Sequence, residues 1–170
     1  MDTFEIFIHE WYEKQNALCT ETEIDELRNN CDLCLRLYHE ITEEPKAIIR
    51  IDSRDFENLF SDNYEVYAYE CSIDGKDLQR IAKLVYIIKE KMGYSQSPRK
   101  LLLYLFAPDK NDLLTSEIET VNDWLNESFN NIEIRFGLGI NENCYIWCCR
   151  LYYWFNSIIL HRIFWRSTFY

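Results

Sequence analysis

Glycine and proline are scarce in this sequence of 170 residues, which contains 4 Gly and 3 Pro. These residues punctuate loops and turns, so their scarcity predicts long regular elements joined by few elaborate loops. The one close pair, Gly137 and Gly139, falls inside a predicted strand, where we interpret it as a turn or a bulge. A phosphate-binding loop needs backbone N–H groups gathered at a helix N-terminus, and this chain offers no glycine-rich loop to do so.

Positive charge is scarce outside the C-terminal segment. The formal net charge is -11, and no acidic residue follows Glu142. Residues 143–170 contain three arginines and no lysine, so the preceding residues carry a net charge of -14. A body this acidic repels phosphate backbones, and we therefore expect no nucleic-acid partner.

A secretory leader is absent from the start of the sequence, because Met1–Glu5 contains two acids where a leader needs positive charge. We therefore expect a cytoplasmic protein whose seven cysteines are reduced. Cys31, Cys34, Cys148 and Cys149 would together supply four thiolates for zinc. However, the first pair lies in a helical pattern and the second alternates along a predicted strand. We predict no metal site and no cofactor.

Residues 1–46 are predicted to be a helical segment that packs on the core. Apolar residues recur at helical spacing from Phe4 to Trp11. Thr20 and Glu23 form a capping box ahead of a second, longer helix, and Pro45 ends it. The predicted buried face of that helix is Ile24, Leu27, Cys31, Cys34, Tyr38 and Ile41.

Residues 47–155 are predicted to form an α/β domain with the order β-α-β-α-β-β. The predicted strands are 47–51, 64–73, 101–107, 132–138 and 144–154, with a helical turn at 54–60 and helices at 77–92 and 116–129. We expect Ser116 and Glu119 to cap the last helix. The fold class is a two-layer sandwich: a four-stranded mixed sheet carries both helices on one face. The N-terminal helices cover part of the other face, and the last two strands form an antiparallel hairpin.

The C-terminal tail, residues 156–170, is aromatic and basic. The longest uncharged run near it, Leu151–Leu160, is far shorter than the roughly 20 residues that a membrane span needs. We expect the tail to pack against the domain, because its apolar residues do not form one arc of a helix. A membrane-surface helix is the alternative.

The stretch Ile49-Arg50-Ile51-Asp52-Ser53-Arg54-Asp55-Phe56 resembles a segment of FtsZ, the bacterial tubulin-like cell-division protein. In that family the loop after the central helix reads Ile-Asn-Leu-Asp-Phe-Ala-Asp-Val. Weaker similarities follow in the family's order at residues 59–71, 101–106, 116–118, 131–137 and 141–142. The resemblance covers the family's C-terminal domain, without the GTPase domain and its glycine-rich loop. It implies that this chain does not bind GTP alone.

The resemblance also implies roles for four residues. Asp52 and Asp55 match the acids that the family inserts into a neighbouring subunit's nucleotide site to orient water. Arg50 replaces the family's Asn, and Arg54 enters between the acids, so both changes add positive charge. These four residues are the candidate partner-binding site. The structural alternative is that Asp52 is a helix N-cap and Asp55 a first-turn acid facing the helix dipole.

The function that we expect is non-catalytic. The three histidines lack an evident catalytic partner, and no nucleophile or metalloprotease motif occurs. The resemblance implies an interaction domain that binds or caps a tubulin-like filament, or binds itself. The alternatives are an enzyme with a small-molecule pocket in the α/β sandwich, and a peripheral membrane adaptor that uses the tail.

Overall fold

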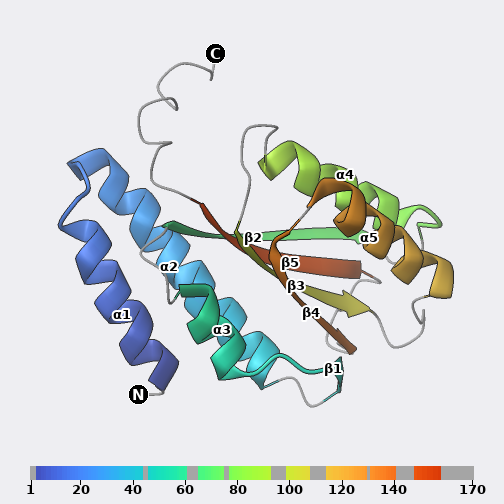
Figure 1. Cartoon of the computed structure of the whole chain (residues 1–170), viewed down its shortest axis with the longest axis horizontal. Coiled ribbons are helices and arrows are strands. Elements are labelled where there is room, and N and C mark those ends of the chain that lie inside the picture. The colour runs from blue at the N-terminus through green and yellow to red at the C-terminus, as the bar shows by residue number, and fades with distance from the viewer. Residues whose placement is uncertain are drawn as a thin grey trace.

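The chain folds as a mixed β-sheet with helices on both faces (Figure 1). The computed structural model describes residues 3–43, 46–60, 65–74, 77–92, 99–107, 114–129, 131–140 and 148–157. The elements are α1 (Thr3–Asn16), α2 (Glu21–Thr42), β1 (Ala47–Ile49), α3 (Ser53–Phe60), β2 (Glu65–Asp74), α4 (Arg80–Met92), β3 (Lys100–Ala107), α5 (Thr115–Ser128), β4 (Glu133–Ile140) and β5 (Cys148–Ser157).

Within the described residues the sheet has five strands in the order β1-β4-β3-β5-β2. β3 and β4 are parallel, β5 is antiparallel to β3 and β2, and β1 is antiparallel to β4. The mixed α/β fold is confirmed. The four-stranded sheet was wrong, because the short β1 adds a strand at the edge of β4. The predicted hairpin was also wrong: β5 pairs with β3 and β2, so that both edges of the buried β3 have hydrogen-bonding partners.

β3 explains the layering, because every residue from Leu101 to Ala107 is buried. Leu102, Tyr104 and Phe106 pack with residues of α1, α2 and α3. The alternate side chains, Leu101, Leu103 and Leu105, pack with α4 and α5. The two predicted helices therefore share one face, as expected. The two-layer description was wrong, since α1–α3 form a full third layer.

The N-terminal helices fold as their pattern indicates. The Thr20 N–H donates to Glu23 Oε2 at 2.8 Å, which is the predicted cap of α2. The described buried residues of α2 are Cys31, Cys34, Leu37, Tyr38 and Ile41. Phe4 of α1 stacks on Tyr38 with 4.2 Å between ring centroids. α1 and α2 therefore share the core beneath α3.

α2 also closes the outer edge of β2. The side-chain amide of Asn30 donates to Val66 O at 2.6 Å, and its Oδ1 accepts from the Ala68 N–H at 2.9 Å. One amide thus makes the two hydrogen bonds that a neighbouring strand would make. Arg36 of α2 pairs with Glu70 at 2.7 Å, and Lys91 Nζ donates to Glu70 O at 3.3 Å. These contacts blunt an edge that would otherwise be open for pairing.

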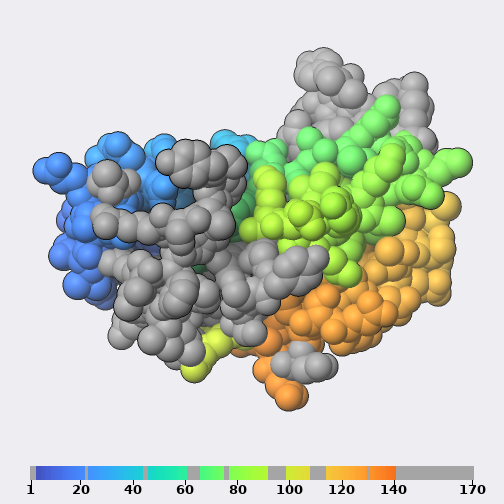
Figure 2. Space-filling model, turned by 90° about the horizontal axis from the view of Figure 1, so that it is seen from above, coloured from blue at the N-terminus to red at the C-terminus, as the bar shows by residue number. Residues whose placement is uncertain are grey.

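α4 and α5 lie side by side on the other face and are joined by a buried ion pair (Figure 2). Arg80 donates through Nε and Nη2 to the two carboxylate oxygens of Glu117, at 2.7 and 2.8 Å. Glu117 also accepts from the Leu114 N–H at 2.9 Å, so it caps its own helix. The predicted cap by Ser116 and Glu119 was wrong, because the helix begins at Thr115.

Candidate functional site at the start of α3

The first turn of α3 is held by two carboxylates. Asp52 Oδ1 accepts from the N–H groups of Arg54 and Asp55 at 2.9 and 3.2 Å. Asp55 Oδ2 accepts from the Asp52 N–H at 3.1 Å. The two acids thus cap the helix reciprocally, and their charge lies at the positive end of its dipole. This is the geometry that the structural alternative predicts.

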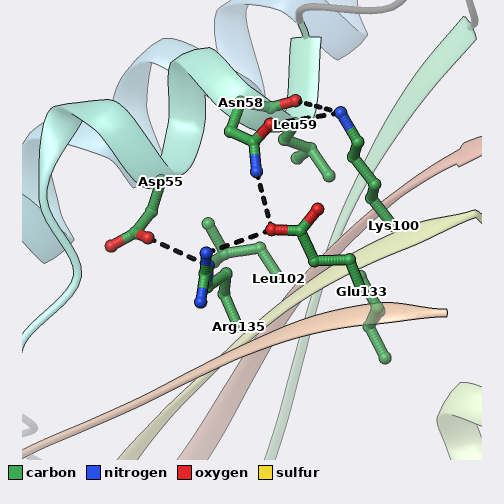
Figure 3. A pocket seen from close by; sticks show the side chains of 8 residues that line it. Asp55, Asn58, Leu59, Lys100, Leu102, Glu133 and Arg135 are labelled. Carbon is green, nitrogen blue, oxygen red and sulfur yellow. Dashed lines mark hydrogen bonds and ion pairs between the residues drawn. The ribbon is translucent and has the colours of Figure 1, made fainter.

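Asp55 is also tied to the sheet. Its Oδ1 lies 3.2 Å from Arg135 Nε on β4, while Arg135 Nη2 lies 3.1 Å from Glu133 Oε1 (Figure 3). Each oxygen of Asp55 therefore has a partner inside the chain. A carboxylate in this arrangement orients α3, and it has less freedom to hold a water molecule for a partner.

A second polar group fastens the middle of α3 to the same end of the sheet. Asn58 Nδ2 donates to Glu133 Oε1 at 2.7 Å. Lys100 Nζ donates to Asn58 O and Oδ1 at 2.7 and 3.2 Å. Lys100 and Glu133 are register partners on the parallel strands β3 and β4, so their side chains start on the same face. The α3 helix is therefore positioned by both strands.

The network borders a small hollow between α3, β3 and β4 (Figure 3). Its cavity volume is about 10 Å³, which is room for roughly one water molecule. Leu59, Leu101 and Leu102 line the rest of it. A metabolite or nucleotide does not fit in this hollow, so it gives no support to the enzyme hypothesis.

Two exposed arginines flank the exposed Asp52 at this corner. Arg50 and Arg54 are both exposed, and in the described part of the chain neither guanidinium has an acidic partner. Arg54 lies in the first turn of α3, where a cation faces the positive end of the helix dipole. Ile48 and Ile49, just before them, are 62% and 43% exposed. We call Ile48, Ile49, Arg50 and Arg54 the basic corner.

Gly137 has a packing role behind the basic corner. A Cβ atom at this position would lie 2.3 Å from Tyr104 Cδ2 and 2.6 Å from Ile51 Cγ1. Gly137 is the register partner of Tyr104, so it leaves room for the ring to cross β4. No turn interrupts β4 here, but the register with β1 shifts beside Gly139, since Ala47 pairs with Gly139 and Ile49 with Leu138. This irregularity is of the bulge type that the sequence allowed.

Four of the six residues in the network were missed from the sequence: Asn58, Lys100, Glu133 and Arg135. A signal was present, since Glu133 and Arg135 alternate with apolar residues and Asp55 and Asn58 are one turn apart. Sequence alone did not indicate that this polar side of β4 lies beneath α3.

The remaining candidates are structural or lie outside the described residues. Among the described residues no group of side chains is suited to hold a metal. Cys31, Cys34 and Cys71 are buried and form no disulfide with another described residue. The side chains of Cys148 and Cys149 lie outside this description. His39 contacts Glu5 of α1 at 3.1 Å, so it joins the two N-terminal helices.

Residues 156 and 157 complete β5, and the rest of the predicted tail, with His161, lies outside the described residues. Across the ranges that are described, no helix combines the length and apolar character needed to cross a bilayer. The choice between a packed tail and a membrane-surface tail stays a prediction.

Solved structures with a similar fold include the tubulin-like proteins FtsZ and TubZ. FtsZ from M. jannaschii, an empty dimer, matches with a TM-score of 0.55 and 18% identity, over 81% of this chain and 38% of that chain. TubZ from Bacillus thuringiensis serovar israelensis, in GDP-form protofilaments, gives 0.56 and 16%, over 76% and 36%. A helical model of the TubZ-Bt four-stranded filament gives 0.55 and 15%, over 89% and 40%.

No protein-family model and no curated protein matches the sequence. At these identities the structural matches show the fold. The chain has the fold of part of an FtsZ- or TubZ-type protein, so the expected resemblance is confirmed. It spans about two fifths of the length of the structures that it matches. The assignment of that part to the C-terminal domain rests on the sequence similarity from Ile49 to Phe56 together with the weaker ones that follow it in the family's order up to residues 141–142.

Proposed function

We propose that this chain is a non-catalytic interaction module that binds a tubulin-like filament protein and caps or modulates its assembly. The observation that carries the proposal is the match to FtsZ and TubZ over most of this chain but only about two fifths of theirs. A partial copy of a polymer-forming fold can present one contact surface while lacking another. Such a module would occupy a filament end without extending it.

The partner-binding surface in this proposal is the start of α3. Asp52 and Asp55 hold the backbone of this turn, and Arg50 and Arg54 supply its outward charge. Since a cation in the first turn of a helix does not stabilise that helix, Arg54 is better explained by a partner than by folding. The partner surface would be acidic. The module itself would neither bind nor hydrolyse GTP, because it offers no glycine-rich phosphate loop.

The test is to add the protein to polymerising FtsZ from the same organism and to measure light scattering and phosphate release. Wild-type protein should lower both signals in proportion to its concentration. Arg50→Glu with Arg54→Glu should abolish the effect, and Arg28→Glu, an exposed site on α2, serves as a control for charge reversal elsewhere on the surface. Wild-type protein that changes neither signal in large excess would remove the basis for the proposal.

The double variant Asp52→Asn, Asp55→Asn distinguishes two roles of these acids: capping α3, or orienting water at the partner's nucleotide site. Asn caps a helix about as well as Asp, so the loss of stability should be about 1 kcal/mol, from the dipole and the exposed pair with Arg135. If the acids only hold the turn, this variant should keep its effect on polymer mass. A folded variant that blocks phosphate release without changing polymer mass would instead indicate that the acids act on the partner's nucleotide.

A further inference from the structure

The two outer edges of the sheet differ in how they are covered. At β2 the backbone of Val66 and Ala68 is occupied by Asn30, and Lys91 reaches Glu70 O. β1 is the last strand at the other end, and among the described residues its only strand partner is β4. An uncovered edge strand is a template for pairing with another chain.

β1 also exposes apolar side chains on this edge. Ile48 is 62% exposed and Ile49 is 43% exposed, while Ile51, two residues later, is 6% exposed and belongs to the core. The exposed isoleucines therefore sit on a short stretch that the core anchors at Ile51. Figure 1 shows β1 at the end of the sheet away from β2, joined to the start of α3 by a short loop. A segment bound along this edge would cover apolar surface of these two isoleucines.

The charge near β1 indicates the kind of partner. Arg50 follows the strand directly and Arg54 lies one turn into α3, whereas the chain as a whole carries -11. A positive edge on a negative protein attracts an acidic segment and repels a basic one. Antiparallel pairing of β1 with β1 of a second copy would bring Arg50 of each copy close to Lys46 of the other. Like charges opposed across a strand pair are unfavourable, so this edge does not suit a symmetric dimer.

We propose that the open edge of β1 binds an extended, acidic segment of a partner protein, which adds to the sheet as a sixth strand. Main-chain hydrogen bonds to β1 would supply affinity, Ile48 would pack against apolar side chains on one face of the segment, and Arg50 and Arg54 would pair with its acids. The inference rests on the proposed interaction function, but it does not require the partner to be tubulin-like.

The test uses fluorescent synthetic peptides and measures binding to the full chain by fluorescence anisotropy. The first peptide alternates valine with glutamate, the second alternates valine with lysine, and the third is the glutamate peptide with all of its backbone amides N-methylated. The third keeps every side chain and charge but cannot pair along a strand. We expect the first to bind, and the second and third to bind at least about tenfold more weakly.

Protein variants locate the site. Ile48→Ser removes the exposed apolar side chain without adding charge and should weaken binding of the glutamate peptide about tenfold. Leu78→Ser is the matched control, since Leu78 is 97% exposed just before α4, away from β1, and should leave binding unchanged. Arg50→Glu should shift the preference toward the lysine peptide.

Three results would overturn the inference: no binding of the glutamate peptide at millimolar concentration, equal binding of the N-methylated peptide, or equal binding by Ile48→Ser protein. Equal binding of the N-methylated peptide would indicate attraction by charge alone. None of these results bears on the FtsZ assay, because a filament protein can contact Arg50 and Arg54 without adding a strand. If the protein bound the glutamate peptide but had no effect on FtsZ, the inference about the β1 edge would stand. The proposal that the partner is a tubulin-like protein would then be wrong.

Discussion

Replacing Asn30 with Ala should destabilise the protein more than a typical substitution at a half-buried position on a helix surface. The Asn30 amide makes two hydrogen bonds to the β2 backbone, at 2.6 Å to Val66 O and 2.9 Å from the Ala68 N–H. Val66 and Ala68 are 1% and 5% exposed, so water does not easily replace these bonds. A buried backbone group left without a partner costs about 1–3 kcal/mol. Because Asn30 is itself only half-buried, we expect a total loss of about 2–4 kcal/mol.

The neighbouring Asn29 provides the control, because it is exposed on the same helix. Asn29→Ala should be neutral or stabilising by about 0.5 kcal/mol, since Ala favours a helix more than Asn does. Asn30→Asp keeps the acceptor for the Ala68 N–H but turns a carboxylate oxygen toward Val66 O. It should therefore be at least as destabilising as Asn30→Ala.

Urea denaturation with a common m-value measures these differences. A variant Asn30→Ala that unfolds at the same urea concentration as Asn29→Ala would refute the reasoning, because the edge of β2 would then not depend on this amide. Light scattering of the folded variant gives a second readout. An uncovered β2 edge should raise its tendency to aggregate.

Three other predictions follow from single contacts. Gly137→Ala should cost about 1–3 kcal/mol or more, because its Cβ would lie 2.3 Å from the Tyr104 ring; an unchanged thermal midpoint would contradict this. Arg80 holds the pKa of Glu117 below its usual value of 4.5, so the pair's contribution to stability is complete above that pH and is lost as pH falls through the folded pKa. Glu117→Gln should lower the free energy of unfolding by about 3 kcal/mol at pH 7 and reduce its dependence on pH in the acid range. An unchanged pH dependence would contradict a stabilising role for the ion pair. Burial raises the pKa of Cys31 to about 12, so native protein at pH 8 should resist iodoacetamide at this thiol until urea unfolds it, as mass spectrometry would detect.

Much of the fold was predictable because local patterns were strong. The unbroken apolar run from Leu101 to Ala107 predicted a strand buried on both faces, and the spacing from Cys31 to Ile41 predicted the buried face of α2. The capping residues Thr20 and Glu23 gave the start of that helix within one residue. Each of these signals depends on neighbours in the sequence.

Strand pairing was less predictable, because it depends on which edges are open after the other strands have paired. The last strand follows β4 in sequence, so a hairpin was the simplest expectation. β5 instead pairs with β3 and β2. β1 was recognised as a strand, but a segment from Ala47 to Ile49 is too short to indicate that it joins the sheet.

The candidate site was predicted in part. The resemblance to FtsZ drew attention to Asp52 and Asp55, and capping preference predicted the contacts that they make. The ion pair from Asp55 to Arg135 was not predictable, because the two residues are separated by four elements of the chain. The exposure of Arg50 and Arg54 likewise depends on tertiary structure.

The central claim is that the basic corner binds a tubulin-like protein. The most direct test is the binding of FtsZ from the same organism, measured by sedimentation velocity with wild-type protein and with the double variant Arg50→Glu, Arg54→Glu. A glutamate at position 54 lies favourably at the start of α3, so the variant should keep or gain about 0.5 kcal/mol of stability. The account predicts a complex with wild type and at least about a tenfold weaker complex with the variant. Equal binding by both proteins, or no complex with either, would contradict it.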